Sequence, residues 1–523
     1  MIADFETSEA PDHAPYVVVG AGAVGLLFAT YLSRQGKEVL VLETGGRSYN
    51  ASAQSLNTSI ISGRPHEGVT SGRARILGGT STLWGGQLIA FDKIDMEPRP
   101  WLGLSGWPIS REELSPYYSK VAQVLGLDST SADDASVWQE IKLESPNLDP
   151  DFTVILTRWL KEPNIARYFS QDLETAANLT VLLHAQCTGF QFKEDGATIS
   201  AVSIASPGGR TAEVKADNVI VATGTIEASR LMLATAQHQV PWRDNPWVGR
   251  CFQDHLDARS AKVHIKDKRA FHDKFDNIVV RGFKYQPKIR SSGAFQRDNS
   301  TTNIAASFVA DSDIAEHISK LKIAIRSIMR GAKPNNLGEL FKSIKGASSV
   351  WIPLVLRYLR DNRVMQVSDR GLYLVTHCEQ IPIAESKILL STTERDAFGV
   401  PLVDLHWQVD GREVEGVRHF VKGLGAVLES QGIATLEVDP RLEKGDADFL
   451  EACQDTNHQC GGLRMAVLPD DGVTDTNSKI HGCENLYIAG AAVFPSSSFA
   501  NPTFTAMALA LRLAEHLNAK SAA

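Results

Sequence analysis

The stretch YVVVGAGAVGLLFATYLSRQGKEVLVLETGG, residues 16–46, decides the fold. Its apolar run at 16–19 predicts a short buried strand, which leads into a glycine-rich turn. A helix is expected over 24–35, and a second strand over 38–42 ends at an acidic residue. Strand, glycines, helix, strand and terminal acid in this order predict a βαβ unit that binds a dinucleotide.

The three glycines of this turn have separate tasks. Gly20 permits the tight turn, Gly22, followed by Ala23, lets the backbone approach a pyrophosphate, and Gly25 lets helix and strand pack closely. Glu43 is placed to accept hydrogen bonds from an adenosine ribose. The fingerprint alone leaves NAD and FAD open, and a merely structural glycine turn is the alternative interpretation.

The composition is that of an ordinary globular protein. At 523 residues, with 43% hydrophobic and 22% charged residues, the chain is expected to hold two domains. A net charge of −8 argues against a nucleic-acid partner, and six scattered cysteines favour a reducing compartment. The start of the chain lacks the pattern of a signal peptide, and no stretch is long enough to span a membrane. The expected location is the cytoplasm.

Two observations favour FAD over NAD. A second glycine fingerprint, common in flavoproteins reduced by NAD(P)H, is missing, and there is no CxxC redox pair. In addition, ADNVIVATGTIEASRLML at 216–233 reads as a strand and a helix that return to the nucleotide-binding unit. That domain is therefore expected to be discontinuous.

Several motifs in order resemble the glucose-methanol-choline (GMC) oxidoreductases. They include RILGGTSTLWGGQLIAFD at 75–92, NHQCGGLRMA at 457–466 and NLYIAGAAVFPSSSFANPTFTAMALAL at 485–511, and the pattern is most similar to the sugar-oxidising branch. The resemblance implies an α/β Rossmann-like FAD domain, residues 1–259 and 452–523, with a parallel sheet covered by helices. Residues 260–451 should form a mostly antiparallel substrate domain with a helical insertion at 312–362. Its strands are expected at 277–285, 303–310, 371–379, 386–391 and 401–409.

The resemblance also implies the catalytic pair. His458 matches the histidine above the flavin that accepts the hydroxyl proton, a task that suits an imidazole near neutral pH. Asn501 matches the residue that pairs with this histidine, although an N-cap of the following helix is its plainer interpretation. A loop histidine, or a metal site with Cys453 and Cys460, are the alternatives for His458; the spacing fits zinc poorly, and no metal is expected.

Further residues are expected around the cofactor. The helix that starts at Pro502 should direct its N-terminal dipole at the flavin, with Thr503 nearest. The resemblance assigns other cofactor contacts to Gly78, Gly79, Thr80, Ser81, Cys187, Gly224, Gly490 and Ala491. Trp84 and Gln87 are candidates for the substrate wall. Leu83 stands where fungal pyranose oxidases carry the histidine that binds FAD covalently, so non-covalent FAD is expected.

The predicted reaction is oxidation of a secondary hydroxyl of a sugar or glycoside to a ketone. A sterol, a choline-like or an aromatic alcohol is the alternative substrate, and a flavin-binding protein without turnover is a different class. Oxygen or another molecule could accept the electrons. The sequence is consistent with a monomer, a homo-oligomer or a subunit of a larger complex, and it has no predicted membrane span.

Overall fold

A mixed eight-stranded sheet forms around the glycine-rich turn. In the computed structural model its order is β1-β8-β3-β2-β11-β10-β9, with β21 also paired to β11. The pairings from β1 to β11, and β11 with β21, are parallel, whereas β9, β10 and β11 form an antiparallel meander because short turns connect them. Its strands are β1 (Ile2–Asp4), β2 (His13–Val19), β3 (Val39–Leu42), β8 (Leu179–Leu183), β9 (Gln186–Phe192), β10 (Ile199–Ala205), β11 (Thr211–Val221) and β21 (Leu486–Ile488).

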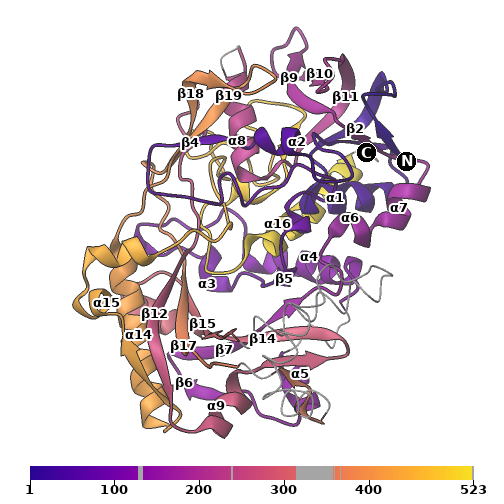
Figure 1. Ribbon diagram of the computed structural model, residues 1–523. Helices are drawn as coiled ribbons and strands as arrows, with labels where there is room; N and C mark the ends of the chain where they lie inside the picture. Colours follow the sequence, from indigo (N-terminus) through magenta and orange to yellow (C-terminus); the bar gives the residue numbers. More distant parts are fainter. Residues whose placement is uncertain (128–133, 237–238, 314–356, 358–359, 365–366, 521–523) are drawn as a thin grey trace.

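The second sheet has ten strands, all paired antiparallel. Its order is β16-β13-β14-β15-β17-β12-β20, and β7 joins at β14 and carries β5 and β6. Its strands are β5 (Gln87–Leu88), β6 (Asn147–Asp149), β7 (Phe152–Trp159), β12 (Leu256–Ile265), β13 (Asn277–Val280), β14 (Phe283–Ser291), β15 (Ile304–Asp311), β16 (Arg363–Val364), β17 (Gly371–Cys378) and β20 (Ala434–Val438). This sheet lies in the lower half of Figure 1.

Helices fill the space around the two sheets. The C-terminal helix α16 packs against α1 and α4 and lies between the two sheets in Figure 1. The longer helices are α1 (Ala23–Arg34), α4 (Arg111–Val124), α8 (Gly224–Thr235), α9 (Lys268–Phe275), α14 (Arg412–Ser430) and α16 (Pro502–Lys520). The shorter ones are α2 (Ala51–Ser55), α3 (Lys93–Met96), α5 (Asp134–Glu140), α6 (Ile165–Tyr168), α7 (Ser170–Thr175), α10 (Gly293–Asp298), α15 (Pro440–Lys444), η1 (Gly79–Thr82), η2 (Pro100–Leu102), η4 (Ala447–Ala452) and η5 (Ala491–Val493).

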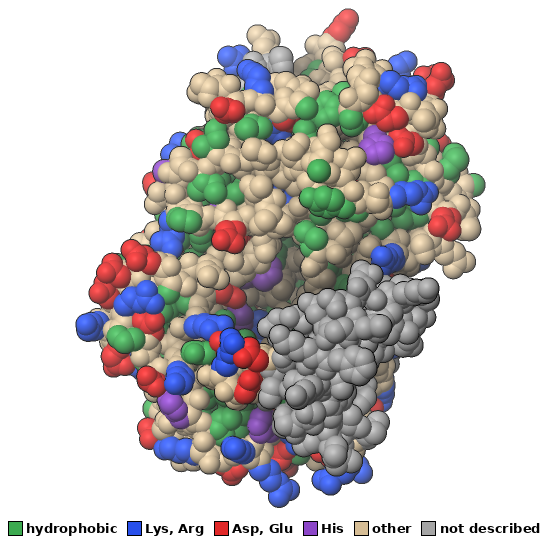
Figure 2. All heavy atoms as spheres, in the orientation of Figure 1, with side chains coloured by type: hydrophobic (Ala, Val, Ile, Leu, Met, Phe, Trp, Pro, Cys, Tyr) green, Lys and Arg blue, Asp and Glu red, His purple; other side chains and the backbone are tan. Residues whose placement is uncertain are grey.

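The structure describes residues 1–127, 134–236, 239–313, 357, 360–364 and 367–520. The predicted helical insertion at 312–362 lies almost wholly outside the described residues, as does the apolar segment 348–359. Within the described residues no helix is both long and apolar enough to cross a membrane. On the face shown in Figure 2, acidic and basic side chains are interspersed over α14 and α15.

The fold class is confirmed, and the structure adds two details. The stretch 277–285, expected as one strand, is a hairpin, because Arg281 and Gly282 both adopt positive φ and turn the chain between β13 and β14. The strands expected at 386–391 and 401–409 do not join the large antiparallel sheet. They form β18 (Lys387–Arg395) and β19 (Pro401–His406) of a separate three-stranded sheet with β4 (Ser59–Ile61).

The predicted domain boundaries remain a prediction. The strand pairings bear on them in one respect, because β5, β6 and β7 precede residue 259 and yet belong to the ten-stranded sheet. The chain therefore crosses between the two sheets more often than a single returning segment requires.

A buried ion pair joins several of the segments that run between the two sheets. Arg99 donates two hydrogen bonds to Glu379, at 2.5 and 2.6 Å, and the side chains are 1% and 0% exposed. The Glu379 carboxylate also accepts the backbone N–H of Asn303 at 3.0 Å and of Ser498 at 3.2 Å. One side chain thus joins the end of β17, the start of β15 and the segment that leads into α16.

We predict that Arg99→Met lowers the free energy of unfolding by about 3–5 kcal/mol, because it leaves the buried Glu379 carboxylate without a counter-charge. Chemical denaturation of the purified protein measures this loss. Arg412→Met is the matched control, since its partner Asp410 is at the surface and such pairs contribute about 0.2–1 kcal/mol. Equal midpoints for the two variants would contradict the structural role of the pair.

Candidate active site

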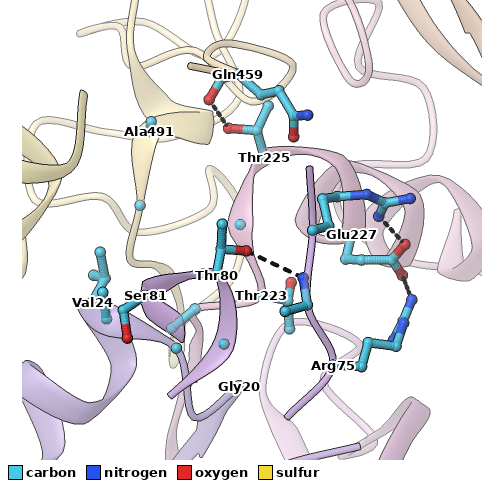
Figure 3. Close-up of a pocket in the computed structure, with 18 of the residues that line it drawn as sticks. Gly20, Val24, Arg75, Thr80, Ser81, Thr223, Thr225, Glu227, Gln459 and Ala491 are labelled. Atoms are coloured by element: carbon cyan, nitrogen blue, oxygen red, sulfur yellow. Dashed lines mark hydrogen bonds and ion pairs between the residues drawn. The ribbon is translucent and has the colours of Figure 1, made fainter. Parts of the chain in front are cut away.

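A cavity of about 680 Å³ runs along the carboxyl ends of the parallel strands. It is lined by the turn after β2, the end of β3, the segment 71–87, the start of α8 and the loops 456–459 and 489–503. Figure 3 shows Gly20 and Val24, Thr80 and Ser81, Thr223 and Thr225, and Ala491 around the same space. Segments that are hundreds of residues apart in sequence therefore form one elongated site.

The glycines of the first turn make room for backbone and for a ligand in different ways. A Cβ on Gly25 would lie 2.1 Å from the carbonyl oxygen of Gly20, so Gly25 is required by the packing of α1 on the turn. A Cβ on Gly20 would lie 2.7 Å from the carbonyl oxygen of Ala222. A Cβ on Gly22 would meet no protein atom within 4 Å, and Gly22 with Ala23 lines the cavity. Gly25 itself does not line the cavity.

The same pattern recurs on the opposite side of the cavity. Gly224 and Gly490 adopt positive φ, and a Cβ on either would meet no protein atom within 4 Å. Both line the cavity, together with Ala491, Pro502 and Thr503. A cradle of bare backbone at the starts of α1, α8 and η5 fits the phosphates and rings of a dinucleotide, which approach backbone N–H groups closely.

Glu43 lies at the end of β3 inside the cavity, as predicted. Its carboxylate accepts the backbone N–H of Ala21 at 3.0 Å and of Gly45 at 2.8 Å, and each oxygen keeps a lone pair for a ligand hydroxyl. Burial raises the pKa of Glu43 to about 7, against the opposing effect of these two hydrogen bonds. The acid therefore fixes the turn and faces the nucleotide site at the same time.

An arginine cluster beside this end of the cavity is absent from the sequence predictions. The Glu227 carboxylate lies 2.6 Å from Arg73 Nη1 and 2.8 Å from Arg75 Nη2, and Figure 3 shows the contact with Arg75. Arg230 approaches it from the same helix at 3.4 Å. Burial raises the pKa of Glu227, but the three arginines outweigh that effect and lower it. No local pattern in the sequence marks this cluster, because 73–75 and 227–230 meet only in the fold.

The segment 78–81 was predicted as a flavin loop. Gly79, Thr80 and Ser81 line the cavity, whereas Gly78 does not. Gly78 instead adopts positive φ before η1, and its carbonyl oxygen accepts the Ser81 hydroxyl at 2.5 Å. Ser81 Oγ in turn accepts the N–H of Ile165 at 3.1 Å. Gly78 and Ser81 thus shape the turn, and Thr80 presents its side chain beside Ala74 (Figure 3).

Cys187, Trp84 and Gln87 also line the cavity. Burial raises the pKa of the Cys187 thiol to about 12, so this thiol stays protonated. Trp84 donates its indole N–H to the carbonyl of Pro163 at 2.8 Å. Gln87 donates to Thr157 Oγ1 at 2.7 Å and to Gln286 Oε1 at 3.1 Å, which makes a polar row across β5, β7 and β14. Trp159 is a further lining residue that the sequence did not indicate.

His458 and Asn501 meet at the cavity wall. The Asn501 amide nitrogen lies 2.8 Å from His458 Nε2, and the other amide atom, Oδ1, is buried without a hydrogen-bond partner. Asn501 therefore faces the histidine instead of capping α16. Burial lowers the pKa of His458 below its usual 6.5, while the carboxylates of Asp254 and Asp257 oppose the shift. A neutral imidazole at neutral pH can accept a proton.

Cys453 and Cys460, the alternative metal ligands, do not direct their thiols at the His458 ring. The Cys453 and Cys460 thiols approach the carbonyl oxygens of Phe449 and His458. A different group, His66 with Asp254 and Asp455, has atoms within metal-ligand range of one another. Hydrogen bonds occupy those atoms: His66 Nε2 lies 3.1 Å from Asp254, and Asp455 accepts the N–H groups of 67 and 68.

A cradle of glycine backbone that ends at a paired imidazole and amide defines the class of protein, a flavin-dependent oxidoreductase.

Comparisons with known families agree with this class. Residues 15–247 match the FAD dependent oxidoreductase family, and residues 382–510 match the GMC oxidoreductase family. The chain therefore carries a segment similar to the GMC oxidoreductases and a segment similar to the FAD dependent oxidoreductases, and it is an FAD-dependent enzyme that acts on alcohol groups.

The relatives are distant. The fructose dehydrogenase large subunit of Gluconobacter japonicus is 20% identical over 96% of this chain and 97% of its own. A C-glycoside 3-oxidase of Microbacterium trichothecenolyticum is 29% identical, over 26% of this chain and 24% of its own. A pyranose 2-oxidase of Emericella nidulans is 40% identical over 12% of each chain. A solved fungal aryl-alcohol oxidase, 15% identical, has a TM-score of 0.61 over 98% of this chain and all of its own, which shows the shared fold.

We predict that Gly22→Ala and Gly25→Ala separate cofactor binding from folding. Gly22 has φ −80°, so alanine fits its backbone, and the new methyl group enters only the ligand space. Gly22→Ala should leave the melting temperature of the cofactor-free protein unchanged and weaken FAD binding about tenfold or more. Gly25→Ala should lower that melting temperature as well, because its methyl group clashes with Gly20. Melting curves and FAD titrations of both proteins test this, and unaltered FAD affinity in Gly22→Ala would contradict the site.

Proposed function

We propose that the protein oxidises a secondary hydroxyl of a sugar or glycoside to a ketone, with His458 as the base. The observation that carries the proposal is the His458–Asn501 pair at the wall of the dinucleotide cavity. FAD supplies the acceptor for the hydride that leaves the carbinol carbon. The protein supplies the remaining requirements, which are a site for the proton and a hold on the substrate oxygen.

The two side chains divide these tasks. The substrate hydroxyl donates to His458 Nε2 and replaces the contact with Asn501, and the O–H proton passes to the imidazole. Asn501 then holds the substrate oxygen from the other side through its amide, whose second polar atom has no partner in the described structure. The N-terminus of α16 places positive partial charge beside the cofactor site, which favours electron-rich groups there.

Two lines support a sugar over a less polar alcohol. Gln87 lines the cavity with a polar amide that is held by hydrogen bonds to Thr157 and Gln286, and this amide suits a substrate with several hydroxyl groups. The named relatives include a fructose dehydrogenase, a C-glycoside 3-oxidase and a pyranose 2-oxidase. The notable counter-observation is the pair Trp84 and Trp159, which also line the cavity and suit an aromatic or sterol alcohol. We keep that alcohol class as the second candidate.

We also propose non-covalent FAD, a cytoplasmic location, and oxygen or another molecule as the final acceptor. Leu83, 59% exposed, offers no nucleophilic atom for a covalent link at the position before Trp84. One relative is the large subunit of its enzyme, which supports a search for a partner subunit. A homo-oligomer is the other arrangement to test.

An anaerobic absorbance titration with hexoses, glycosides, a sterol, choline and aryl alcohols tests the reaction. We expect a sugar or glycoside to bleach the bound flavin, and His458→Ala to slow bleaching by about 10²–10⁴-fold while FAD stays bound. His264→Ala, at an exposed histidine paired with Glu437, should behave like the parent protein. Bleaching by aryl alcohols alone would favour the second candidate, and full activity of His458→Ala would refute the base.

The pH dependence has a defined direction. His458 accepts a proton only when neutral, and burial lowers its pKa below 6.5. The rate of flavin bleaching should therefore be flat across neutral pH and fall only when the pH drops below that lowered pKa. Stopped-flow measurements between pH 4 and 9 locate the decline, and a midpoint above 6.5 would contradict the expectation. The groups that face His458 and set this pKa are Asp254, His255, Asp257, Lys288 and His377.

A further inference from the structure

One buried carboxylate holds the loop that carries His458. Asp254 Oδ1 accepts the backbone N–H of Thr456 at 3.3 Å and of His458 at 3.0 Å, and the Thr456 hydroxyl at 2.9 Å. On its other side, Asp254 Oδ2 lies 3.1 Å from His66 Nε2, and both side chains are fully buried. His66 Nδ1 accepts the N–H of Val69, so Nε2 carries the proton toward Asp254.

The Thr456 hydroxyl lies between this carboxylate and the imidazole. Its oxygen is 2.8 Å from His458 Nδ1, and it has one proton to donate. Burial raises the pKa of Asp254, but the hydrogen bond from His66 and the neighbouring histidines lower it to about 2, so the carboxylate is charged. Hydrogen bonds to a charged acceptor are the stronger ones. Thr456 therefore donates to Asp254 and keeps a lone pair for His458.

We propose that Asp254 and Thr456 are positioning residues that fix the tautomer of His458. Thr456 Oγ1 accepts a hydrogen bond from the Nδ1–H group, and Nε2 is left with its lone pair toward the cavity. This inference rests on the proposed role of His458 as base.

Two other neighbours of the ring agree with this tautomer. The Asn501 amide nitrogen, 2.8 Å from Nε2, is a donor and requires an acceptor there. His255 Nδ1 lies 3.1 Å from His458 Nδ1, so at most one of these two nitrogens carries a proton. Burial lowers the pKa of His255 to about 3, which keeps it neutral and able to accept. A bare Nδ1 on His255 agrees with the tautomer in which His458 Nδ1 carries the proton.

The tautomer determines how the proton moves. When the substrate hydroxyl transfers its proton, the O–H bond breaks, a bond to Nε2 forms, and the electron pair stays on the substrate oxygen. The proton on Nδ1 stays in place, and the Nδ1–H group continues to donate its hydrogen bond to Thr456. The new positive charge of the ring is stabilised by Thr456 and, through that hydroxyl, by the Asp254 carboxylate.

The test compares three threonine variants of the FAD-loaded protein. Thr456→Val keeps the side-chain shape and removes the acceptor, Thr456→Ser keeps the hydroxyl, and Thr235→Val removes a buried hydroxyl in α8 that bonds only to its own helix. With the substrate found in the titration, we expect bleaching about tenfold or more slower in Thr456→Val and within about threefold of the parent in the other two. Substrate affinity should stay unchanged, and the acid limb should move to lower pH because the charged ring loses an acceptor.

A second readout is independent of activity. Solid-state ¹⁵N spectra of histidine-labelled protein distinguish protonated from unprotonated ring nitrogens, and the signals missing from His458→Gln identify this residue. We expect a protonated Nδ1 and a bare Nε2 in the parent and in Thr456→Ser. A proton on Nε2 in the parent protein would overturn the inference whatever the variants do.

The outcomes separate the two proposals. If Thr456→Val bleaches at the parental rate while His458→Ala does not bleach, the tautomer role is wrong and the base stands. If His458→Ala also bleaches at the parental rate, the proposed base is wrong and this inference fails with it. Should Thr456→Val lose FAD, the ¹⁵N spectra of the parent and Thr456→Ser still decide the tautomer.

Discussion

The Glu379 carboxylate is the point on which the arrangement of the two sheets depends. It is fully buried, it pairs with Arg99, and it accepts N–H groups from 303 and 498. A buried charge is tolerated only with such complete satisfaction, so the segments that satisfy it have little freedom to move apart. Ser498 lies three residues before Asn501. The position of the amide that meets His458 is therefore tied to the end of β17 in the other sheet.

The active site also contains buried carboxylates that are stabilised by neighbouring polar groups, and here several histidines surround them. Carboxylates at 254 and 257 are ionised within a buried cluster of histidines, of which His255, His377 and His458 all have lowered pKa values because of burial. The rings are neutral and the acids are charged. The carboxylates of Asp254 and Asp257 offset part of the cost of placing a proton on the buried His458 ring.

The parts of the fold that could be predicted from sequence are those with local causes. The turn at 20–25 is set by neighbouring residues, and α1 and β3 lie within one residue of their predicted limits. The pairing of His458 with Asn501 came from the family resemblance and lies as expected in the structure. The hairpin at 281–282 carried a signal, since a glycine after a polar residue between apolar runs favours a turn.

What the sequence could not provide depends on contacts between distant segments. Asp254 and Thr456 are 202 positions apart, and Arg73 and Glu227 are 154 apart, so no spacing rule connects them. The pairing of β19 with β4 joins residues 403 and 59 in the same way. Such contacts form only when the fold brings the segments together. Each of these polar side chains belongs to a residue type that is usually exposed, so its sequence position alone does not reveal the contact.

The order of the chain has a consequence for how the protein acquires its cofactor. The first glycine turn leaves the ribosome early, but the cavity also requires 456–459, 489–491 and the start of α16. A nascent chain that lacks those last segments exposes the turn to solvent and presents half a cradle. The complete cofactor site therefore forms only when the first glycine turn and these distant segments have come together.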